Sequence, residues 1–113
     1  MKILEKLLSP GPEVYYSEAF RRVLEDHMTY LRTHSDTTLL TVESFTAYKH
    51  RGDLFRVLQS YNVPGYMHWT IMRMNNLTSP SDFKETTVSL LIPATGVLER
   101  MRSTHLSQSK LKK

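Results

Sequence analysis

The chain has 113 residues, of which 40% are apolar, which suits one domain with a single core and excludes two independent cores. It contains no cysteine, which excludes a disulfide framework and thiolate metal ligands and favours an intracellular setting. No stretch approaches the roughly 20 apolar residues of a membrane span, and charges interrupt the N-terminal letters MKILEKLL too early for a signal peptide. We therefore expect no membrane partner.

The net charge of +4 is concentrated at the C-terminal end of the chain. Residues 94–113 carry one acidic side chain, Glu99, against five basic ones: Arg100, Arg102, Lys110, Lys112 and Lys113. The basic residues form only a short segment, and the rest of the chain shows no basic stripe interleaved with aromatic residues. We therefore do not expect nucleic acid as a partner. We expect a solvated tail over residues 94–113 without a core of its own, and the same for residues 1–12.

Residues 17–32 have the spacing of an amphipathic helix, within an N-terminal extension over residues 1–38. Ser17 is a suitable N-cap, and the stripe repeats at i, i+3, i+4, i+7 and i+11 through Phe20, Val23, Leu24, His27 and Leu31. A lone histidine on such a stripe is more often a hydrogen-bonded packing residue than a ligand. The letters THSDTT then end the helix.

The central segment predicts the order strand, helix, helix, strand. Residues 39–48 are rich in β-branched and aromatic side chains and are expected to be extended, leading into a strand. Gly52 can supply the positive φ of a tight turn, and Asp53 can cap a helix whose apolar stripe is Leu54, Val57, Leu58 and Tyr61.

The letters NVPG break that helix, and a second one is predicted over residues 66–75, followed by a strand over residues 86–93. The predicted fold class is therefore α+β, with two short helices packed on a two-stranded antiparallel sheet. We expect Leu58, Tyr61 and Trp69 to contribute to the core between helices and sheet.

The letters YKHRGDLFRVLQSYNVP, IMRMNNLTSP and VSLLIP, in this order, resemble a LysM domain. The matching residues are Tyr48, Gly52, Asp53, Leu54, Val57, Tyr61, Val63, Asn75, Leu77, Leu90, Ile92 and Pro93. This resemblance implies a LysM-like βααβ core over residues 39–93. Asn62 stands where the family usually has glycine, which is compatible because asparagine adopts the left-handed region comparatively well.

A narrower resemblance, carried by the N-terminal helix, SYNVPGYMHW and MNN, is to the LysM-like baseplate wedge subunits of contractile-tailed bacteriophages. It implies a structural subunit of the virion tail baseplate, assembled in the host cytoplasm in multiple copies and bound to other baseplate and tail proteins. It also implies protein-binding surfaces, for which we expect the aromatic anchors Phe55, Tyr66 and Phe83, with the basic side chains Arg100, Arg102, Lys110, Lys112 and Lys113 docking on an acidic neighbour.

The alternative that the LysM resemblance implies is binding of peptidoglycan or chitin, polymers that contain N-acetylglucosamine. The family's shallow groove corresponds here to Arg51, Gly52, Asp53, Leu54, Phe55, Asn76, Leu77 and Thr78, with the second loop continuing to Ser81. The letters RGD are explained by a turn followed by a helix cap. No histidine pair, nucleophile elbow or phosphate-binding loop is recognisable, so we expect no enzyme, no metal and no cofactor.

Overall fold

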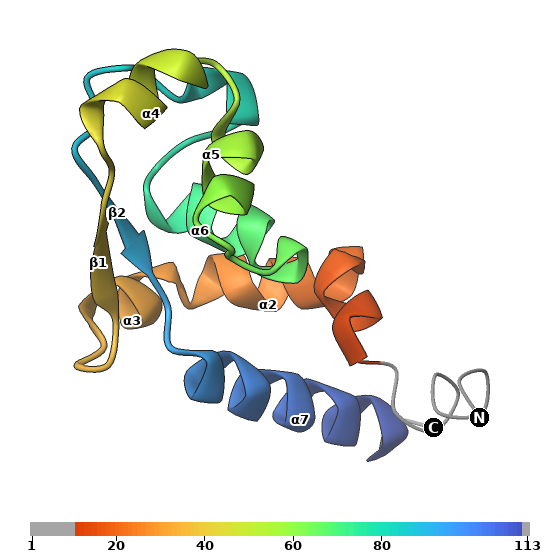
Figure 1. Cartoon of the computed structure of the whole chain (residues 1–113). Helices are drawn as coiled ribbons and strands as arrows, with labels where there is room; N and C mark the ends of the chain where they lie inside the picture. Colours follow the sequence, from red (N-terminus) through yellow and green to blue (C-terminus); the bar gives the residue numbers. More distant parts are fainter. Residues whose placement is uncertain (1–10, 112–113) are drawn as a thin grey trace.

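The structure, a computed structural model, describes the backbone of residues 11–111 and the side chains of residues 14–107 (Figure 1). It is a mixed helical and stranded fold in which a two-stranded antiparallel sheet flanks a group of short helices. Along the chain the elements are η1 (Gly11–Tyr16), α2 (Glu18–Asp26), α3 (Met28–Thr33), β1 (Thr38–Thr41), α4 (Ser44–Lys49), α5 (Leu54–Ser60), η2 (Gly65–Met67), α6 (His68–Met74), η3 (Pro80–Asp82), β2 (Ser89–Ile92) and α7 (Thr95–Leu111), where η marks a 3-10 helix. None of the described helices is both long and apolar enough to cross a membrane.

The sheet pairs β1 with β2 from Thr38 opposite Ile92 to Thr41 opposite Ser89. Leu90 lies on the face that packs against the helices and is buried, whereas Leu39 on the other face is 65% exposed. This alternation is the normal period of two in a strand. One face of the sheet therefore joins the core and the other faces outward.

The prediction of extended structure over residues 39–48 is wrong in its second half, because Ser44–Lys49 form helix α4. The ladder ends where the Val42 N–H donates to the Val88 carbonyl at 2.9 Å, and no described strand continues beside the chain beyond that point. Its backbone groups find partners within a helix instead, with Ala47 buried against the core. The β-branched and aromatic residues in the second half of this segment therefore do not indicate a strand.

Two helices, α2 and α3, occupy the segment for which one continuous helix was predicted. Ser17 caps α2, since its hydroxyl oxygen accepts the Phe20 N–H at 3.2 Å. The break falls at His27, whose N–H bonds back to the Leu24 carbonyl at 3.1 Å. The His27 side chain is exposed, and its Nδ1 lies 2.8 Å from the Val23 carbonyl oxygen, so it is not part of the buried stripe.

Left-handed residues lie in the turns around α5 and α6, as predicted for Gly52 and Asn62. Gly52, Asn62 and Asn76 have φ of 77°, 62° and 63°. The Asp53 side chain caps α5 by accepting the Arg56 N–H at 3.2 Å. Helices α5 and α6 start and stop close to the predicted positions because these residues supply left-handed and capping geometry that few others can.

The prediction of a tail without a core over residues 94–113 is corrected by α7, a helix of 17 residues. Val97 and Leu98 are buried, and the Tyr15 hydroxyl donates to the Glu99 carboxylate at 2.9 Å, which fixes α7 beside η1. The sequence missed this helix because its apolar positions are few and sit near its start. The expectation for residues 1–12 falls almost entirely outside the described residues.

The core lies between the helices and the inner face of the sheet. Leu58 is fully buried as predicted, while Tyr61 and Trp69 are half-buried at its border. The Tyr61 hydroxyl accepts the Glu43 N–H at 2.9 Å, which uses its polar end. The largest fully buried side chains are Phe20, Leu24, Leu31, Leu54, Leu58, Ile71, Met74, Leu90 and Leu98, together with Val57 and Thr70.

Candidate interaction site

The turn between α4 and α5 lies against the loop that connects η3 to β2. The Gly52 N–H donates to the Phe83 carbonyl at 2.8 Å, which joins the two segments. Just before this loop, the Asp82 carboxylate accepts the N–H groups of Thr78 and Ser79 at 3.0 and 3.1 Å, which fixes the start of η3. Between the two segments is a shallow groove of about 400 Å³, lined by Arg51, Gly52, Ser81, Phe83, Lys84, Glu85 and Thr86.

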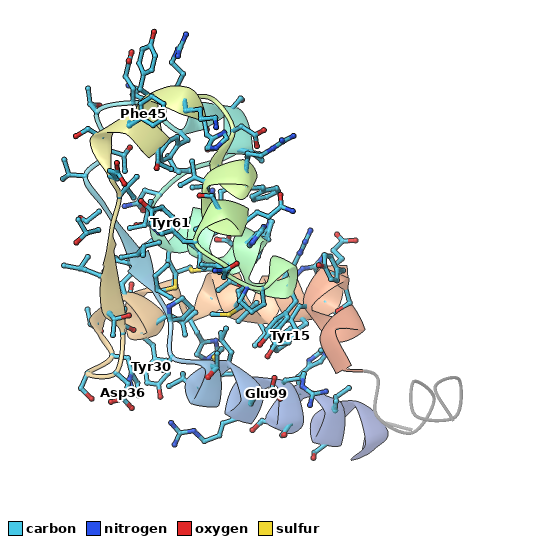
Figure 2. All side chains as sticks on the ribbon, in the orientation of Figure 1. Tyr15, Tyr30, Asp36, Phe45, Tyr61 and Glu99 are labelled. Carbon is cyan, nitrogen blue, oxygen red and sulfur yellow. The ribbon has the colours of Figure 1, made fainter. Side chains whose placement is uncertain are left out.

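Beside this groove, α4 presents two large aromatic side chains to solvent. Phe45 is 66% exposed and Tyr48 is 54% exposed. The Arg51 guanidinium stacks on the Tyr48 ring at 4.4 Å from its centroid and donates to the Tyr48 carbonyl at 2.8 Å. Figure 2 shows Phe45 at the end of the molecule remote from Tyr30 and α7. We call Phe45, Tyr48, Arg51 and the groove the turn-end surface.

The predicted groove residues agree only in part with the residues that line the groove. Arg51, Gly52 and Ser81 line it, but Leu54 is fully buried and the Asp53 carboxylate is used as a helix cap. Phe55 is half-buried, with its ring 5.5 Å from that of His68. The lining comes instead from residues 83–86.

The predicted loop residues 76–78 lie outside the groove, and each of them is hydrogen-bonded to another part of the chain. The Asn76 side-chain oxygen accepts from the Arg32 guanidinium at 2.8 Å, and the Leu77 carbonyl accepts from Arg73 at 3.0 Å. Thr78 is held through its N–H by Asp82. The second loop therefore reaches the groove only from Ser81 onward.

All three predicted aromatic anchors, Phe55, Tyr66 and Phe83, are engaged within the protein. Phe83 is only 2% exposed, so the prediction that it contacts a partner is wrong for the folded chain. Tyr66 is half-buried, and its ring centroid lies 4.6 Å from that of Tyr15. Tyr16 and Tyr30 are also exposed, but the pair that lies beside the groove is Phe45 and Tyr48, which were not predicted as anchors. Their spacing of i, i+3 is the signal that could have placed them on one face of a helix.

The predicted basic cluster is divided by the structure. Arg102 donates to Glu99 at 2.9 Å and its side chain is only 17% exposed, so it belongs to the fold. Arg100 is exposed on α7. Lys110 lies within α7, but its side chain is not described, and Lys112 and Lys113 are outside the described residues.

A second cluster of aromatic residues joins η1 and α6 through Arg21 on α2. The Arg21 guanidinium is 4.9 Å from the Trp69 ring centroid and 5.6 Å from that of Tyr16, and its Nε donates to the Tyr15 carbonyl at 3.1 Å. Such stacking orders the arginine and shields one face of each ring. Trp69 is therefore a border residue shared by the core and the surface.

The clearly perturbed pKa values among the described groups belong to structural contacts. Burial, followed by the hydrogen bond to Glu99, raises the pKa of the Tyr15 hydroxyl well above its usual range. The hydrogen bond with Glu25 raises the pKa of Arg73. Among residues 11–111, no group of three potential metal-binding side chains is clustered.

Comparison with family models, with curated proteins and with solved structures finds no match to this chain.

Proposed function

We propose that this protein is a structural subunit of a phage tail baseplate, a LysM-like block that joins hub proteins to wedge or sheath-proximal proteins. In this proposal β1, α5, α6 and β2 form the LysM-like unit, with α4 inserted after the first strand and α2, α3 and α7 added around it. Support comes from the order of these elements and from the left-handed residues at Gly52, Asn62 and Asn76.

The observation that carries a protein-binding role is the turn-end surface. Large exposed aromatic side chains beside an arginine match the composition of interface hot spots, in which Trp, Tyr and Arg are enriched. Phe45 and Tyr48 project from α4 without joining the core, so their exposure is not explained by folding. Binding a partner there would remove apolar surface from water.

The test is incorporation into particles. A Phe45→Ala, Tyr48→Ala double variant should fold like the parent, because both side chains are exposed, and should be absent from purified phage tails. Tyr30→Ala, which removes an exposed aromatic at the far end, is the matched control and should be incorporated normally. Mass spectrometry of tails assembled in infected cells measures both. Normal incorporation of the double variant would contradict the use of this surface.

Peptidoglycan or chitin binding is the second candidate, favoured by the groove between Arg51 and Ser81 next to the Tyr48 ring. Carbohydrate sites combine polar hydrogen-bonding groups with an aromatic face, and both are available there. Pull-down with peptidoglycan and titration with N-acetylglucosamine oligomers test it. Saturable binding that is lost in Tyr48→Ala, together with normal tail assembly of that variant, would replace the structural proposal with this one.

A further inference from the structure

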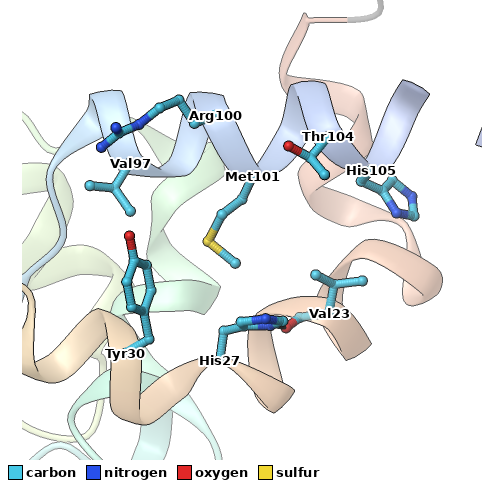
Figure 3. Close-up of a pocket in the computed structure, with 8 residues that line it drawn as sticks. All are labelled: Val23, His27, Tyr30, Val97, Arg100, Met101, Thr104 and His105. Atoms are coloured by element: carbon cyan, nitrogen blue, oxygen red, sulfur yellow. Dashed lines mark hydrogen bonds between the residues drawn. The ribbon is translucent and has the colours of Figure 1, made fainter. Parts of the chain in front are cut away.

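A groove separate from the turn-end surface runs between α7 and the helices α2 and α3. Its volume is about 340 Å³, within the range of small-molecule sites. Its apolar wall is formed by Val23 on α2 and by Val97 and Met101 on α7. Figure 3 shows Met101 extending into the space between the helices from the middle of the α7 wall.

Polar side chains line this groove along its whole length, since His27, Thr104 and His105 contribute to it besides Arg100 and Tyr30. At one end the Arg100 guanidinium and the Tyr30 hydroxyl lie close to Val97, while Val23 and His105 lie toward the other end (Figure 3). No carboxylate is among the lining side chains. Arg100 makes no ion pair with any described side chain, in contrast to Arg102, which pairs with Glu99. The groove thus combines an apolar wall with polar side chains and carries the Arg100 guanidinium at one end.

We propose that this groove binds a small apolar carboxylate, with the head group at Arg100 and Tyr30 and the hydrocarbon body against Val23, Val97 and Met101. An arginine can donate two hydrogen bonds to a carboxylate, and hydrogen bonds between charged groups are the stronger ones. Burial of the hydrocarbon body supplies the non-directional part of the affinity. The size of the groove suits a single- or double-ring aromatic acid or a medium-chain fatty acid. This inference is independent of the proposed structural role.

The first measurement uses 1-anilinonaphthalene-8-sulfonate as a fluorescent probe with an apolar body and an anionic head. Its neutral analogue, N-phenyl-1-naphthylamine, has the same kind of body without the charge. We expect saturable binding of the sulfonate at one site and weaker binding of the neutral analogue. Decanoate and 1-naphthoate are then added separately, and displacement by one or both identifies whether an aliphatic or an aromatic acid fits better.

Charge variants locate the head group. Arg100→Gln should weaken binding of the sulfonate about tenfold while changing binding of the neutral analogue less than about twofold, because only the sulfonate uses the guanidinium. Arg22→Gln is the matched control, since it makes the same change in net charge on α2 at a side chain that is 73% exposed and does not line the groove. It should leave both probes unaffected.

The position of the hydrocarbon body is read from the methyl groups of methionine by NMR. In protein labelled with 13C at these methyls, the sulfonate should shift Met101 strongly and leave the buried Met28, Met67, Met72 and Met74 nearly unchanged. Probe binding to a loosened core would shift the buried methyls instead. That result, equal affinities for wild type and Arg100→Gln, or failure of both carboxylates to displace the probe would overturn the proposal.

Discussion

Replacing Asn75 with alanine removes the side chain that joins the end of α6 to β2. Its amide nitrogen donates to the Ile71 carbonyl at 2.7 Å and to the Leu91 carbonyl at 3.1 Å, and its oxygen accepts the Leu91 N–H at 2.8 Å. Leu91 lies opposite Leu39, and in an antiparallel ladder only every second pair of opposite residues exchanges hydrogen bonds. The pair Leu39–Leu91 is one that does not, so the N–H and C=O of Leu91 point away from β1. The Asn75 side chain thus makes the two hydrogen bonds to Leu91 that a neighbouring third strand would otherwise make.

The expected cost follows from these three bonds. A typical hydrogen bond contributes about 1 kcal/mol net, and an unpaired backbone group costs more when water cannot reach it. Leu91 is half-buried, so its freed groups become partly hydrated, and we expect Asn75→Ala to lower the free energy of unfolding by about 2–3 kcal/mol. For a domain of this size that is a fall in Tm of about 10 °C.

Urea denaturation followed by circular dichroism measures the loss. Gln59→Ala is the matched control, because it removes an exposed amide on α5 and should change the free energy of unfolding by less than about 0.5 kcal/mol. A value for Asn75→Ala within that same range would refute the reasoning. Asn75→Asp provides a further check.

The aspartate keeps an acceptor for the Leu91 N–H but turns a carboxylate toward two carbonyl oxygens. That environment raises its pKa in the folded state, so the variant should be at least as unstable as Asn75→Ala at pH 7. Relative to wild type at the same pH, it should recover part of its stability as the pH falls through this raised pKa, because the protonated carboxyl can donate, and the recovery should be complete below about pH 4.

Three other substitutions test separate parts of the fold by the same denaturation assay. Leu58→Ala should lower the free energy of unfolding by about 2–5 kcal/mol because the side chain is fully buried, and a melting temperature within a degree of the parent would contradict its place in the core. Gly52→Ala should cost about 1–2 kcal/mol through its φ of 77° alone, since the nearest atom to an added Cβ is 4.0 Å away, and an unchanged stability would mean that the turn relaxes. Tyr15→Phe should cost about 1 kcal/mol at pH 7. Because the pKa of Tyr15 is raised in the folded state, its contribution is complete below pH 10 and is lost as pH rises above that value, so wild type should lose more stability than the variant between pH 9 and 11; parallel curves would exclude this linkage.

Local backbone chemistry was the most predictable part of this fold. Ser17, Gly52, Asp53, Asn62 and Asn76 each occupy the cap or left-handed position that their residue type favours. These preferences act over three or four residues and need no knowledge of the tertiary structure. They therefore placed α5 and α6 correctly.

Features that depend on distant partners were less predictable. A strand continues only while a neighbour is paired with it, and the position of β2 ended β1 at Thr41, so the residues that follow became helix α4. In the same way α7 is held by Tyr15 and by a few apolar residues near its start, not by a strong periodic stripe. The error in the candidate site has the same cause, since Phe83 is buried, and Phe45 and Tyr48 are exposed on α4, where the sequence predicts extended structure.

The antiparallel register of β1 and β2 also determines how the protein responds to a pulling force. The segment from α3 enters the sheet at Thr38, and the segment leading to α7 leaves it at Ile92, directly opposite. Tension between these two flanking segments separates the strand pairs one after another, from Thr38–Ile92 inward. Sequential opening needs much less force than sliding all the pairs at once. The sheet is mechanically weak in this direction, so a load on the folded protein is better borne through contacts on its faces than through the segments that flank the sheet.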